Sequence, residues 1–376
     1  MPFPKNVRKV EDVLSEQLSN LSGGKVGIIY SPKHLEHSHT QSSPENPERI
    51  QQIYNYIKSR EELFKDKCDI FTDVKVASEK DILEVHNASY IDFIKKYCNS
   101  GGGFLGDSTY LCPKSYEVAS YAVGGAIRAA ELVLEGKYDF GYALVRPPGH
   151  HASSNSYGGF CILNNGAILA RRLQKMGMKK IMFVDWDVHA GNGTMKIFYQ
   201  DPTILKVSIH RSPKDFYPNE GFSNQIGEKE GLGFSVNLEL PEGSGDNEYM
   251  LSFIEIVIPL YEQFKPDFVI GCCGFDAHHS EKYTKMNMTS EGLFAIVKSI
   301  SRISKGKMVV LMEGGYNKNN AKLAHTIINA LCGKTLPFEE KVNSLSSSYS
   351  KREKVHRLAN ENIASLKGHL KEYWKF

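Results

Sequence analysis

Two aspartates and one histidine in this sequence could together bind a metal ion. Asp187 and His189 lie two residues apart in the run DWDVHAGNG (185–193), and Asp276 lies in the run CCGFDAHH (272–279). Two carboxylates and one imidazole make three protein ligands, and a catalytic zinc keeps three protein ligands and an open fourth position. Fe(II) and Co(II) also accept such ligands. In the alternative interpretation, the aspartates of the first run cap the helix that follows.

Two adjacent histidines, His150 and His151, follow a stiff Pro-Pro-Gly sequence in the run RPPGHH. A neutral imidazole can take a proton from water, and a metal ion makes that water more acidic. Asp185 and Asn192 are candidates to fix the tautomers of the two rings. An aspartate partner raises the basicity of an imidazole, whereas an asparagine orients the ring without adding charge. The two histidines are therefore expected to differ.

A tyrosine completes the set of candidate groups. Tyr316 follows two glycines in the run EGGYN, which let the backbone turn. Its hydroxyl could donate a hydrogen bond to an oxyanion that develops opposite the metal. Alternatively, it is a loop tyrosine packed on its own turn.

These groups follow predicted strands. From about residue 112 onward, short β-branched runs alternate with longer helical patterns, which indicates βαβ units and one parallel sheet. Ligands of such sheets bind at the carboxyl ends of the strands, where the candidate residues lie. The predicted strands are 25–30, 139–145, 180–185, 203–209, 233–239, 267–271 and 307–312, and the predicted helices are 113–135, 162–176 and 289–303.

The two ends of the chain stand apart from this core. Apolar residues at helical spacing over residues 7–21 predict an amphipathic helix that docks on the core or on a second subunit. The serine-rich stretch 343–350 predicts a linker, followed by a polar terminal helix. Its thin apolar seam is Leu358, Ile363, Leu366 and Leu370. We therefore expect an N-terminal extension (1–24), a catalytic domain (25–335), and a linker with a C-terminal helix (336–376).

The composition excludes several classes of protein. The chain has 376 residues, of which 41% are hydrophobic, and a net charge of +3, too balanced for sequence-independent nucleic-acid binding. The seven cysteines are scattered without a C-x-x-C pair, which favours a reducing compartment. No run of apolar residues is long enough to span a membrane, and the first residues lack the apolar core of a secretory signal. These features predict a soluble, cytoplasmic protein with no nucleic-acid or membrane partner.

The runs RPPGHH, DWDVHAGNGT, VSIHR, GFDAH and EGGYN occur in the order and approximate spacing found in zinc deacetylases of the arginase-deacetylase fold. Over about residues 25–335 the chain resembles the histone deacetylase superfamily. Asn192 and Glu313 make it more similar to the class II and acetylpolyamine amidohydrolase branches than to class I. The resemblance implies a single-domain, three-layer α/β/α fold with a mostly parallel sheet.

The resemblance also implies roles for individual residues. One zinc per chain would be bound by Asp187, His189 and Asp276. His151 would be the general base and later acid, His150 paired to Asp185 an auxiliary partner, and Tyr316 the group that polarises the scissile carbonyl with zinc. A potassium site would include Asp185, Ser208 and the carbonyls of Asp187, His189 and Ile209, and a second alkali site would lie near Phe198, Asp201, Ile204 and Phe234.

The same resemblance implies a substrate tunnel. Phe160 and Tyr217 would form its walls, the Gly159 carbonyl would accept the substrate amide, and Arg49 would lie near an acetate-release channel. Leu111 stands where class I members carry a substrate-binding aspartate, and Asp107 is expected to replace it. Ala190 replaces a histidine frequent in this loop that is not a zinc ligand. His278, His279 and Tyr283 occupy a rim stretch that is usually richer in glycine and proline, and Tyr283 is expected to contact substrate.

We therefore expect hydrolysis of an N-acetyl amide on an alkyl amine. Its partner would be an acetylated lysine peptide or protein, or an acetylpolyamine. An arginase-like ureohydrolase would need two manganese ions, and a non-catalytic acyl-lysine reader would keep zinc without turnover. The terminal helices are candidate surfaces for a homo-oligomer.

Overall fold

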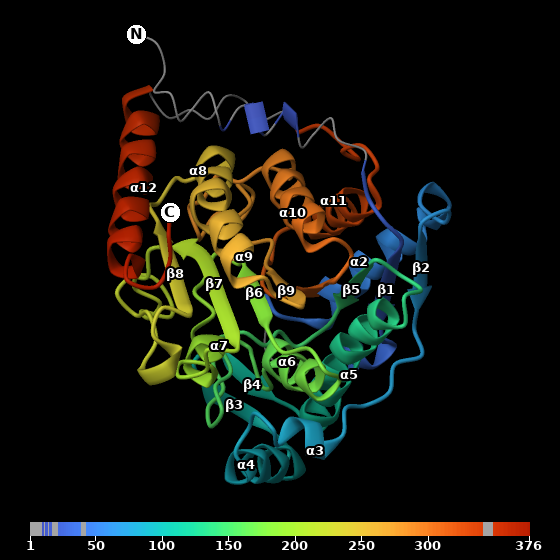
Figure 1. The fold of residues 1–376 in the computed structure, drawn as a ribbon. Helices are drawn as coiled ribbons and strands as arrows, with labels where there is room; N and C mark the ends of the chain where they lie inside the picture. Colours follow the sequence, from blue (N-terminus) through green and yellow to red (C-terminus); the bar gives the residue numbers. More distant parts are fainter. Residues whose placement is uncertain (1–9, 11, 14, 17–21, 39–42, 341–348) are drawn as a thin grey trace.

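The predicted strands assemble into one parallel sheet. The computed structural model describes the chain except for residues 1–9, 11, 14, 17–21, 39–42 and 341–348. Within the described residues the sheet has eight strands in the order β2-β1-β5-β10-β9-β6-β7-β8 (Figure 1). The strands are β1 (Val26–Tyr30), β2 (Cys68–Phe71), β5 (Phe140–Leu144), β6 (Ile181–Asp185), β7 (Ile204–Arg211), β8 (Ser235–Leu240), β9 (Phe268–Cys273) and β10 (Met308–Met312). Of these, β2 was not predicted.

Both faces of the sheet are buried, which explains the continuous apolar runs of its strands. In β10, Met308, Val310 and Met312 enter one hydrophobic cluster, whereas Val309 and Leu311 enter another on the opposite face. This alternation follows from the two-residue period of a strand. The molecule therefore has two cores separated by the sheet, as a three-layer α/β/α fold requires.

Helices cover each face. Three of them confirm predictions: α5 (Ser115–Leu134), α6 (Asn165–Lys175) and α10 (Ser290–Ser304). Figure 1 shows α5 and α6 on one face, and α10 with its neighbours on the other. The remaining helices are α2 (Pro47–Lys58), α3 (Glu79–Ile82), α4 (Ala88–Asn99), α7 (Asn192–Ile197), α8 (Asp246–Ser252), α9 (Ile258–Phe264) and α11 (Asn320–Cys332). Short 3₁₀ segments occur at Pro32–Glu36, Glu61–Leu63 and Lys229–Gly231, and the π-helical segment Phe253–Val257 joins α8 to α9.

A small hairpin lies outside the main sheet. It consists of β3 (Gly103–Gly106) and β4 (Thr109–Leu111), which pair antiparallel. Asp107 and Ser108 in the turn have positive φ angles of 46° and 57°. Such a turn matches the twist of the two strands and accepts aspartate in the left-handed region. The hairpin fixes the direction in which Asp107 points.

The position of β10 in the sheet is not sequential. It pairs with β5 on one side and with β9 on the other. It therefore joins the strands β2, β1 and β5 to the strands β9, β6, β7 and β8.

The C-terminal helix packs on the core of its own chain. This helix, α12 (Tyr349–Leu370), lies beside β8 and α8 (Figure 1). The buried face of α12 includes Ile363, Leu366 and Leu370, as predicted. It differs from the prediction at its beginning, where Val355 and Ala359 are buried and Leu358 is only half-buried. Of the predicted linker 343–350, residues 343–348 lie outside the described residues, and residues 349 and 350 belong to α12.

Most of the predicted helix 7–21 also lies outside the described residues. Among its described positions, Val10 is buried in the core, and Val13 packs against the same cluster. Glu16 forms an ion pair of 2.7 Å with Arg302 on α10. Among all the helices in the described ranges, none has the length and apolarity that crossing a membrane requires.

A buried ion pair anchors the chain just after β5. Arg146 Nε and Nη2 donate to the Glu45 carboxylate at 2.7 and 3.0 Å, and both side chains are fully buried. Arg146 Nη1 donates to the backbone oxygens of His34 and His37. Arg146→Met should lower the free energy of unfolding by about 3–5 kcal/mol, because it leaves a buried carboxylate without its bidentate partner.

Urea denaturation measures this loss. The matched control is Arg357→Met, whose ion pair with Glu361 is more than half exposed, with a distance of 2.6 Å. The control should change the free energy of unfolding by only about 0–1 kcal/mol. Equal effects of the two substitutions would contradict an anchoring role for Arg146.

Candidate active site

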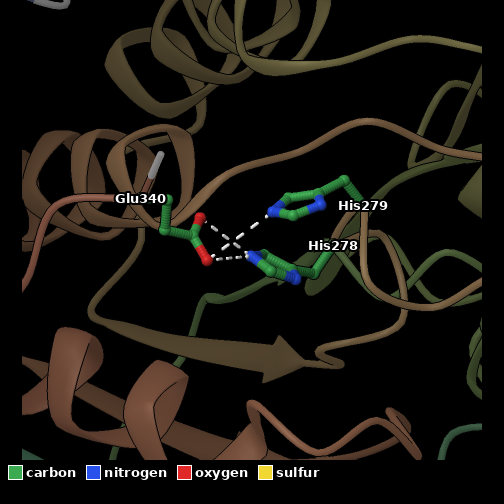
Figure 2. Close-up of side chains that lie close together, drawn as sticks. All are labelled: His278, His279 and Glu340. Atoms are coloured by element: carbon green, nitrogen blue, oxygen red, sulfur yellow. Dashed lines mark hydrogen bonds and ion pairs between the residues drawn. The ribbon is translucent and has the colours of Figure 1, made fainter. Parts of the chain in front are cut away.

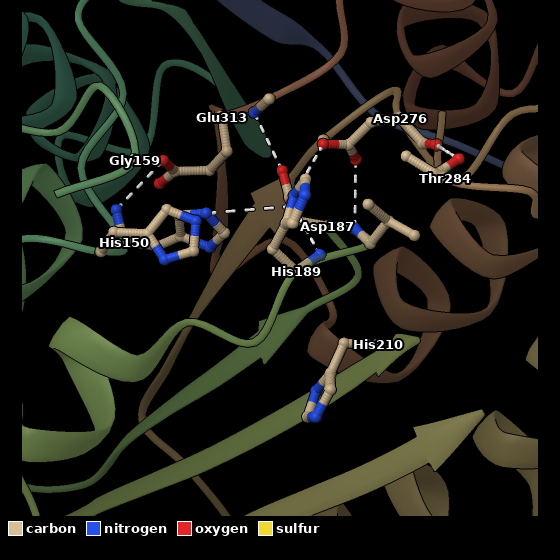
Figure 3. A network of polar contacts seen from close by, with 12 residues as sticks. His150, Gly159, Asp187, His189, His210, Asp276, Thr284 and Glu313 are labelled. Atoms are coloured by element: carbon tan, nitrogen blue, oxygen red, sulfur yellow. Dashed lines mark hydrogen bonds and ion pairs between the residues drawn. The ribbon is translucent and has the colours of Figure 1, made fainter. Parts of the chain in front are cut away.

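The candidate catalytic residues follow four strands that are neighbours in the sheet. These strands are β5, β10, β9 and β6, and all four run parallel. Their carboxyl ends therefore lie at one edge, and the loops that follow them meet there. Figure 3 shows His150, Asp187, His189, Asp276 and Glu313 gathered at this edge.

Asp187, His189 and Asp276 come together as a group of three potential metal ligands. Their ligand atoms all lie within 4.8 Å of one another. His189 Nδ1 lies 3.1 Å from Asp187 Oδ1 and 3.1 Å from Asp276 Oδ2. The backbone N–H groups of Gly314 and Val188 donate to Asp187 Oδ2 at 2.9 Å and to Asp276 Oδ1 at 3.1 Å. These bonds hold the two carboxylates toward the imidazole.

The three side chains fit a divalent cation. Asp276 Oδ2 is buried and accepts no well-aligned hydrogen bond from the described residues. Burial raises the pKa of Asp276, and the nearby Asp187 raises it further. Burial alone would lower the pKa of His189, but the hydrogen bond to Asp187 and the nearby Asp276 carboxylate raise it to about 9. Two close buried carboxylates therefore favour a positive charge between them, and two carboxylates with an imidazole are ligands that zinc accepts.

The two adjacent histidines have different partners. His150 Nδ1 lies 3.2 Å from Asp185 Oδ2, whereas His151 Nδ1 lies 2.8 Å from Asn192 Oδ1. Burial lowers the pKa of His150, but Asp187 and Asp185 raise it to about 10. Burial, followed by the neighbouring His150, holds the pKa of His151 well below its usual value. His150 is therefore the more basic of the two imidazoles, and burial favours the neutral form of His151.

The orientation of Asn192 sets the tautomer of His151. Asn192 Nδ2 donates to Glu220 Oε2 at 2.8 Å, so its Oδ1 faces His151 as an acceptor. The Nδ1 atom of His151 must then carry the proton, which leaves Nε2 with a free lone pair. Glu220 was not predicted from the sequence.

Glu313 and Arg49 position two of the loops. Glu313 Oε2 accepts the backbone N–H groups of Gly149 and His150 at 2.8 and 3.2 Å. Burial raises the pKa of Glu313 to about 7, although His150 opposes this shift. Arg49 donates from Nε to the Gly315 oxygen at 2.7 Å and from Nη2 to the oxygens of Glu313 and Gly314. Arg49 therefore holds the loop after β10, and its place beside an acetate-release channel stays a prediction.

Tyr316 lies against two other side chains. The Arg49 guanidinium lies 4.8 Å from the centre of its ring, and the Phe160 ring meets it edge-on at 5.4 Å. Its backbone N–H donates to Glu281 Oε2 at 2.8 Å. Burial holds the pKa of Tyr316 well above its usual value, against the effect of Arg49. The phenol is therefore neutral and keeps a proton to donate.

Aromatic rings surround His189, one of the three potential metal ligands, and His151. Tyr217 meets the His151 ring edge-on at 4.9 Å, and Phe216 stacks on His189 at 4.9 Å with only 6° between the planes. Tyr217 was predicted as a wall of the substrate tunnel, whereas Phe216 was not predicted. The sequence does contain a pattern that indicates Phe216, because Phe216 and Tyr217 are adjacent aromatic residues in the loop that follows the strand end at His210 and Arg211.

Asp107 connects the β3–β4 hairpin to Tyr217 and Gly159 beside the candidate site. Its Oδ2 accepts the Tyr217 hydroxyl at 2.9 Å, and its backbone oxygen accepts the Gly159 N–H at 3.0 Å. Gly159 has a φ of +51°, and an added Cβ would meet His151 Cδ2 at 2.4 Å. A side chain at this position would therefore displace the neutral histidine.

Asp107→Ala should raise KM about tenfold, because the loss of one hydrogen bond to a carboxylate, about 1.4 kcal/mol, loosens the Tyr217 wall. The effect on kcat should be smaller, since Asp107 is not among the groups that contact the reacting atoms. Steady-state kinetics with the N-acetyl amide that the sequence leads us to expect as substrate separates the two parameters. Tyr217→Phe, which removes the same hydrogen bond but keeps the ring, should give a similar KM. An unchanged KM in Asp107→Ala would contradict this role.

The residues predicted for alkali ions occupy two places. Asp185 and Ser208 are register partners on β6 and β7, next to Ile209, and Ser208 Oγ lies 2.8 Å from His210 Nδ1. At the other place Asp201 already has a cationic partner, since Arg171 Nη1 donates to its Oδ2 at 2.7 Å. The neighbouring predicted residues are Phe198, Ile204 and Phe234. Phe198 lies under the Arg171 guanidinium, and Phe234 packs on Phe264 and Trp374.

Tyr283 and Lys206 differ sharply in burial. Tyr283, predicted to contact substrate, is 90% exposed. Lys206, which was not predicted as a site residue, is fully buried, and its Nζ lies 3.3 Å from Asn237 Oδ1. Burial lowers its pKa to about 8, opposed by Asp185.

Comparisons with known proteins reveal close relatives. The histone deacetylase domain model matches residues 43–331. A protein of Archaeoglobus fulgidus named probable deacetylase is 34% identical over 359 residues, which cover 93% of this chain and 98% of that protein. Histone deacetylase HDA1 of Saccharomyces cerevisiae is 35% identical over 341 residues, which cover 82% of this chain and 48% of that protein. The chain thus spans nearly the whole archaeal protein and about half of the yeast one.

Two other proteins are similar. The histone deacetylase-like amidohydrolase of Pseudomonas aeruginosa is 36% identical over 247 residues, which cover 64% of this chain and 65% of that protein. Among solved structures, the crystal structure of the HDA15 HD domain superposes with a TM-score of 0.82 at 29% identity, and covers 93% of this chain and 95% of that one. Strand β1 precedes the matched domain yet pairs with β5 inside it.

Proposed function

Because this chain belongs to the histone deacetylase family and is a hydrolase, we propose that it uses zinc to cleave the N-acetyl amide of an acetylated alkyl amine, with release of acetate and the free amine. One observation carries the proposal. A neutral His151 and a neutral Tyr316 phenol belong to the same loop cluster as three converging side chains, Asp187, His189 and Asp276, that suit a divalent cation.

Asp187, His189 and Asp276 would hold the zinc. Bound there, zinc supplies a Lewis acid that polarises a carbonyl and lowers the pKa of water. The chain's own groups then manage the protons. His151 Nε2, whose lone pair is left free by the Asn192 contact at Nδ1, takes a proton from water. It returns that proton to the nitrogen of the departing amine, so that the proton count balances.

The remaining groups orient the reaction and stabilise charge. The Tyr316 hydroxyl donates to the oxyanion that develops on the substrate carbonyl. His150 Nε2 lies 3.9 Å from Asp187 Oδ1, where a protonated ring offsets negative charge of the carboxylates. Phe160, Phe216 and Tyr217 provide apolar walls that exclude water from the alkyl chain of the substrate.

The substrate is proposed to be acetyl-lysine in a peptide or protein, or an acetylated polyamine, because both present an acetyl amide on an unbranched alkyl chain. The test compares turnover of acetyl-lysine peptides with that of acetylputrescine and acetylspermidine, with and without a hydroxamate inhibitor. Hydroxamate-sensitive release of acetate from one of these classes is expected. No acetate release from any of them would refute the proposal and favour a non-catalytic acyl-lysine reader.

Other properties of the protein are also proposals. A potassium ion at Asp185, Ser208 and Ile209 is supported by the register of β6 and β7. A cytoplasmic location is supported by all seven cysteines, which lie in described parts of the chain and are free thiols. A homo-oligomer through the terminal helices can be tested by the light-scattering mass of the chain with and without residues 1–24.

A further inference from the structure

A second group of potential metal ligands lies outside the residues assigned above. It consists of His278, His279 and Glu340, whose ligand atoms also lie within 4.8 Å of one another. Figure 2 shows both imidazoles turned toward the Glu340 carboxylate. The histidines come from the loop after β9, and the glutamate comes from the segment that follows α11. Three side chains from two distant parts of the chain thus converge on one point.

The distances within this cluster match those between ligands around one ion. His278 Nε2 lies 3.0 Å from each Glu340 oxygen, and His279 Nε2 lies 3.6 Å from Glu340 Oε1. Zinc at about 2.0–2.1 Å from imidazole nitrogens and carboxylate oxygens places tetrahedral ligands about 3.3 Å apart. The observed separations lie on both sides of that value.

Hydrogen bonding alone does not satisfy the cluster. His279 Nε2 is buried and has no hydrogen-bond partner among the described residues. A proton on His278 Nε2 satisfies one imidazole and the carboxylate, but at 3.6 Å the second imidazole remains unpaired. A cation between the three side chains satisfies both nitrogens at once.

Neighbouring groups orient two of the three ligands. The Ser290 N–H, at the beginning of α10, donates to Glu340 Oε2 at 2.8 Å. His278 Nδ1 lies 2.7 Å from Ser280 Oγ and accepts the Ser280 backbone N–H at 3.3 Å, so Ser280 fixes the ring with Nε2 turned toward Glu340. Metal-binding histidines usually have such a partner for their second nitrogen.

We propose that His278, His279 and Glu340 bind a second divalent cation of borderline character, Zn²⁺, with solvent at the fourth position. Two imidazoles and one carboxylate are ligands that zinc prefers, and the partly exposed His279 leaves a side open to water. The inference goes beyond the proposed function, and it raises the expected zinc content from one to two per chain.

The ion would fasten the segment before residue 341 to the loop between β9 and α10. That loop carries Asp276 and also Glu281, which accepts the Tyr316 N–H. Thr284 Oγ1 donates to the backbone oxygen of Asp276 at 2.7 Å within the same loop (Figure 3). The second cation thus has a structural role, because it holds a loop of the active site in place.

Zinc content tests the proposal on the full chain. Purified protein is equilibrated with zinc, dialysed, and measured by mass spectrometry of the metal. The wild type should hold two zinc ions per chain. His279→Ala and Glu340→Gln should each hold one, and Asp187→Asn should also hold one. The double variant Asp187→Asn/His279→Ala should hold none.

A matched control is available in another histidine-glutamate pair. His356 Nδ1 lies 3.2 Å from Glu248 Oε1 without a second imidazole, so His356→Ala should keep two zinc ions. If His279→Ala fails to fold, Glu340→Gln and His279→Gln answer the same question. The proposal would be overturned if the wild type held one zinc ion and Asp187→Asn held none. It would also be overturned if the zinc content were unchanged in both His279→Ala and Glu340→Gln. The counts do not depend on turnover, so an inactive protein with the expected counts would refute only the proposed function.

Discussion

Asp187→Asn should lower kcat/KM on an acetyl-lysine substrate by about 10⁴-fold or more. The substitution keeps the size of the side chain but removes a charge from the proposed zinc site, and zinc supplies most of the acidity of the attacking water. The Gly314 N–H that Asp187 Oδ2 accepts at 2.9 Å would also face a neutral amide. A fluorogenic acetyl-lysine assay and zinc content, measured on the same preparation, check both consequences.

The control for this variant is Asp69→Asn at the far edge of the sheet. Asp69 Oδ2 accepts the Tyr138 hydroxyl at 2.7 Å in an exposed position, so its loss should leave activity unchanged. A chelator should inactivate the wild type to the same extent as Asp187→Asn, and added zinc should restore the wild type but not the variant. If the wild type kept its activity in the presence of the chelator, the assignment of zinc to this site would be wrong.

Tyr316→Phe should lower kcat by about 10²–10³-fold, because loss of one donor to a developing oxyanion usually has an effect of this size. The ring stays, so its contacts with Arg49 and Phe160 are retained. Zinc content should equal that of the wild type, since the phenol is not among the three ligands. Kinetics and metal analysis together distinguish this result from a loss of metal.

Tyr142→Phe is the matched control. Tyr142 is fully buried in β5, and its hydroxyl has no hydrogen-bond partner among the described residues. Its removal should therefore leave both turnover and zinc content unchanged. Full activity in Tyr316→Phe would remove Tyr316 from the mechanism while leaving the metal site in place.

The sheet was predictable because burial on both faces makes its strands continuous apolar runs. The run KMVVLM became β10 (Met308–Met312) and DFVIG became most of β9 (Phe268–Cys273). The edge strand β2 (Cys68–Phe71) was missed because its burial pattern is mixed, with Asp69 exposed in the middle. Helix α11 (Asn320–Cys332) is almost entirely buried, so it lacks the polar face that marks a surface helix.

The convergence of the candidate residues could be predicted from the sequence, because they follow strands directly and parallel strands end at one edge. The residues that hold them in place could not be named. Arg49 binds the backbone at Gly315, 266 residues away, and nothing in its local sequence indicates that contact. The turn that aims Asp107 at Tyr217 depends on positive φ angles that the loop composition alone did not predict. Such roles arise from tertiary packing.

The central place of β10 in the sheet has a consequence for how this protein is made. During synthesis the ribosome releases β5 with His150 and His151 first, and then β6 and β9 with Asp187, His189 and Asp276. The two sets belong to halves of the sheet that only β10 bridges. A nascent chain that ends before residue 308 therefore carries His150, His151, Asp187, His189 and Asp276, but not the strand that lies between β5 and β9. Because Glu313 and Tyr316 also follow β10, the candidate site is complete only once the chain has been translated past this strand.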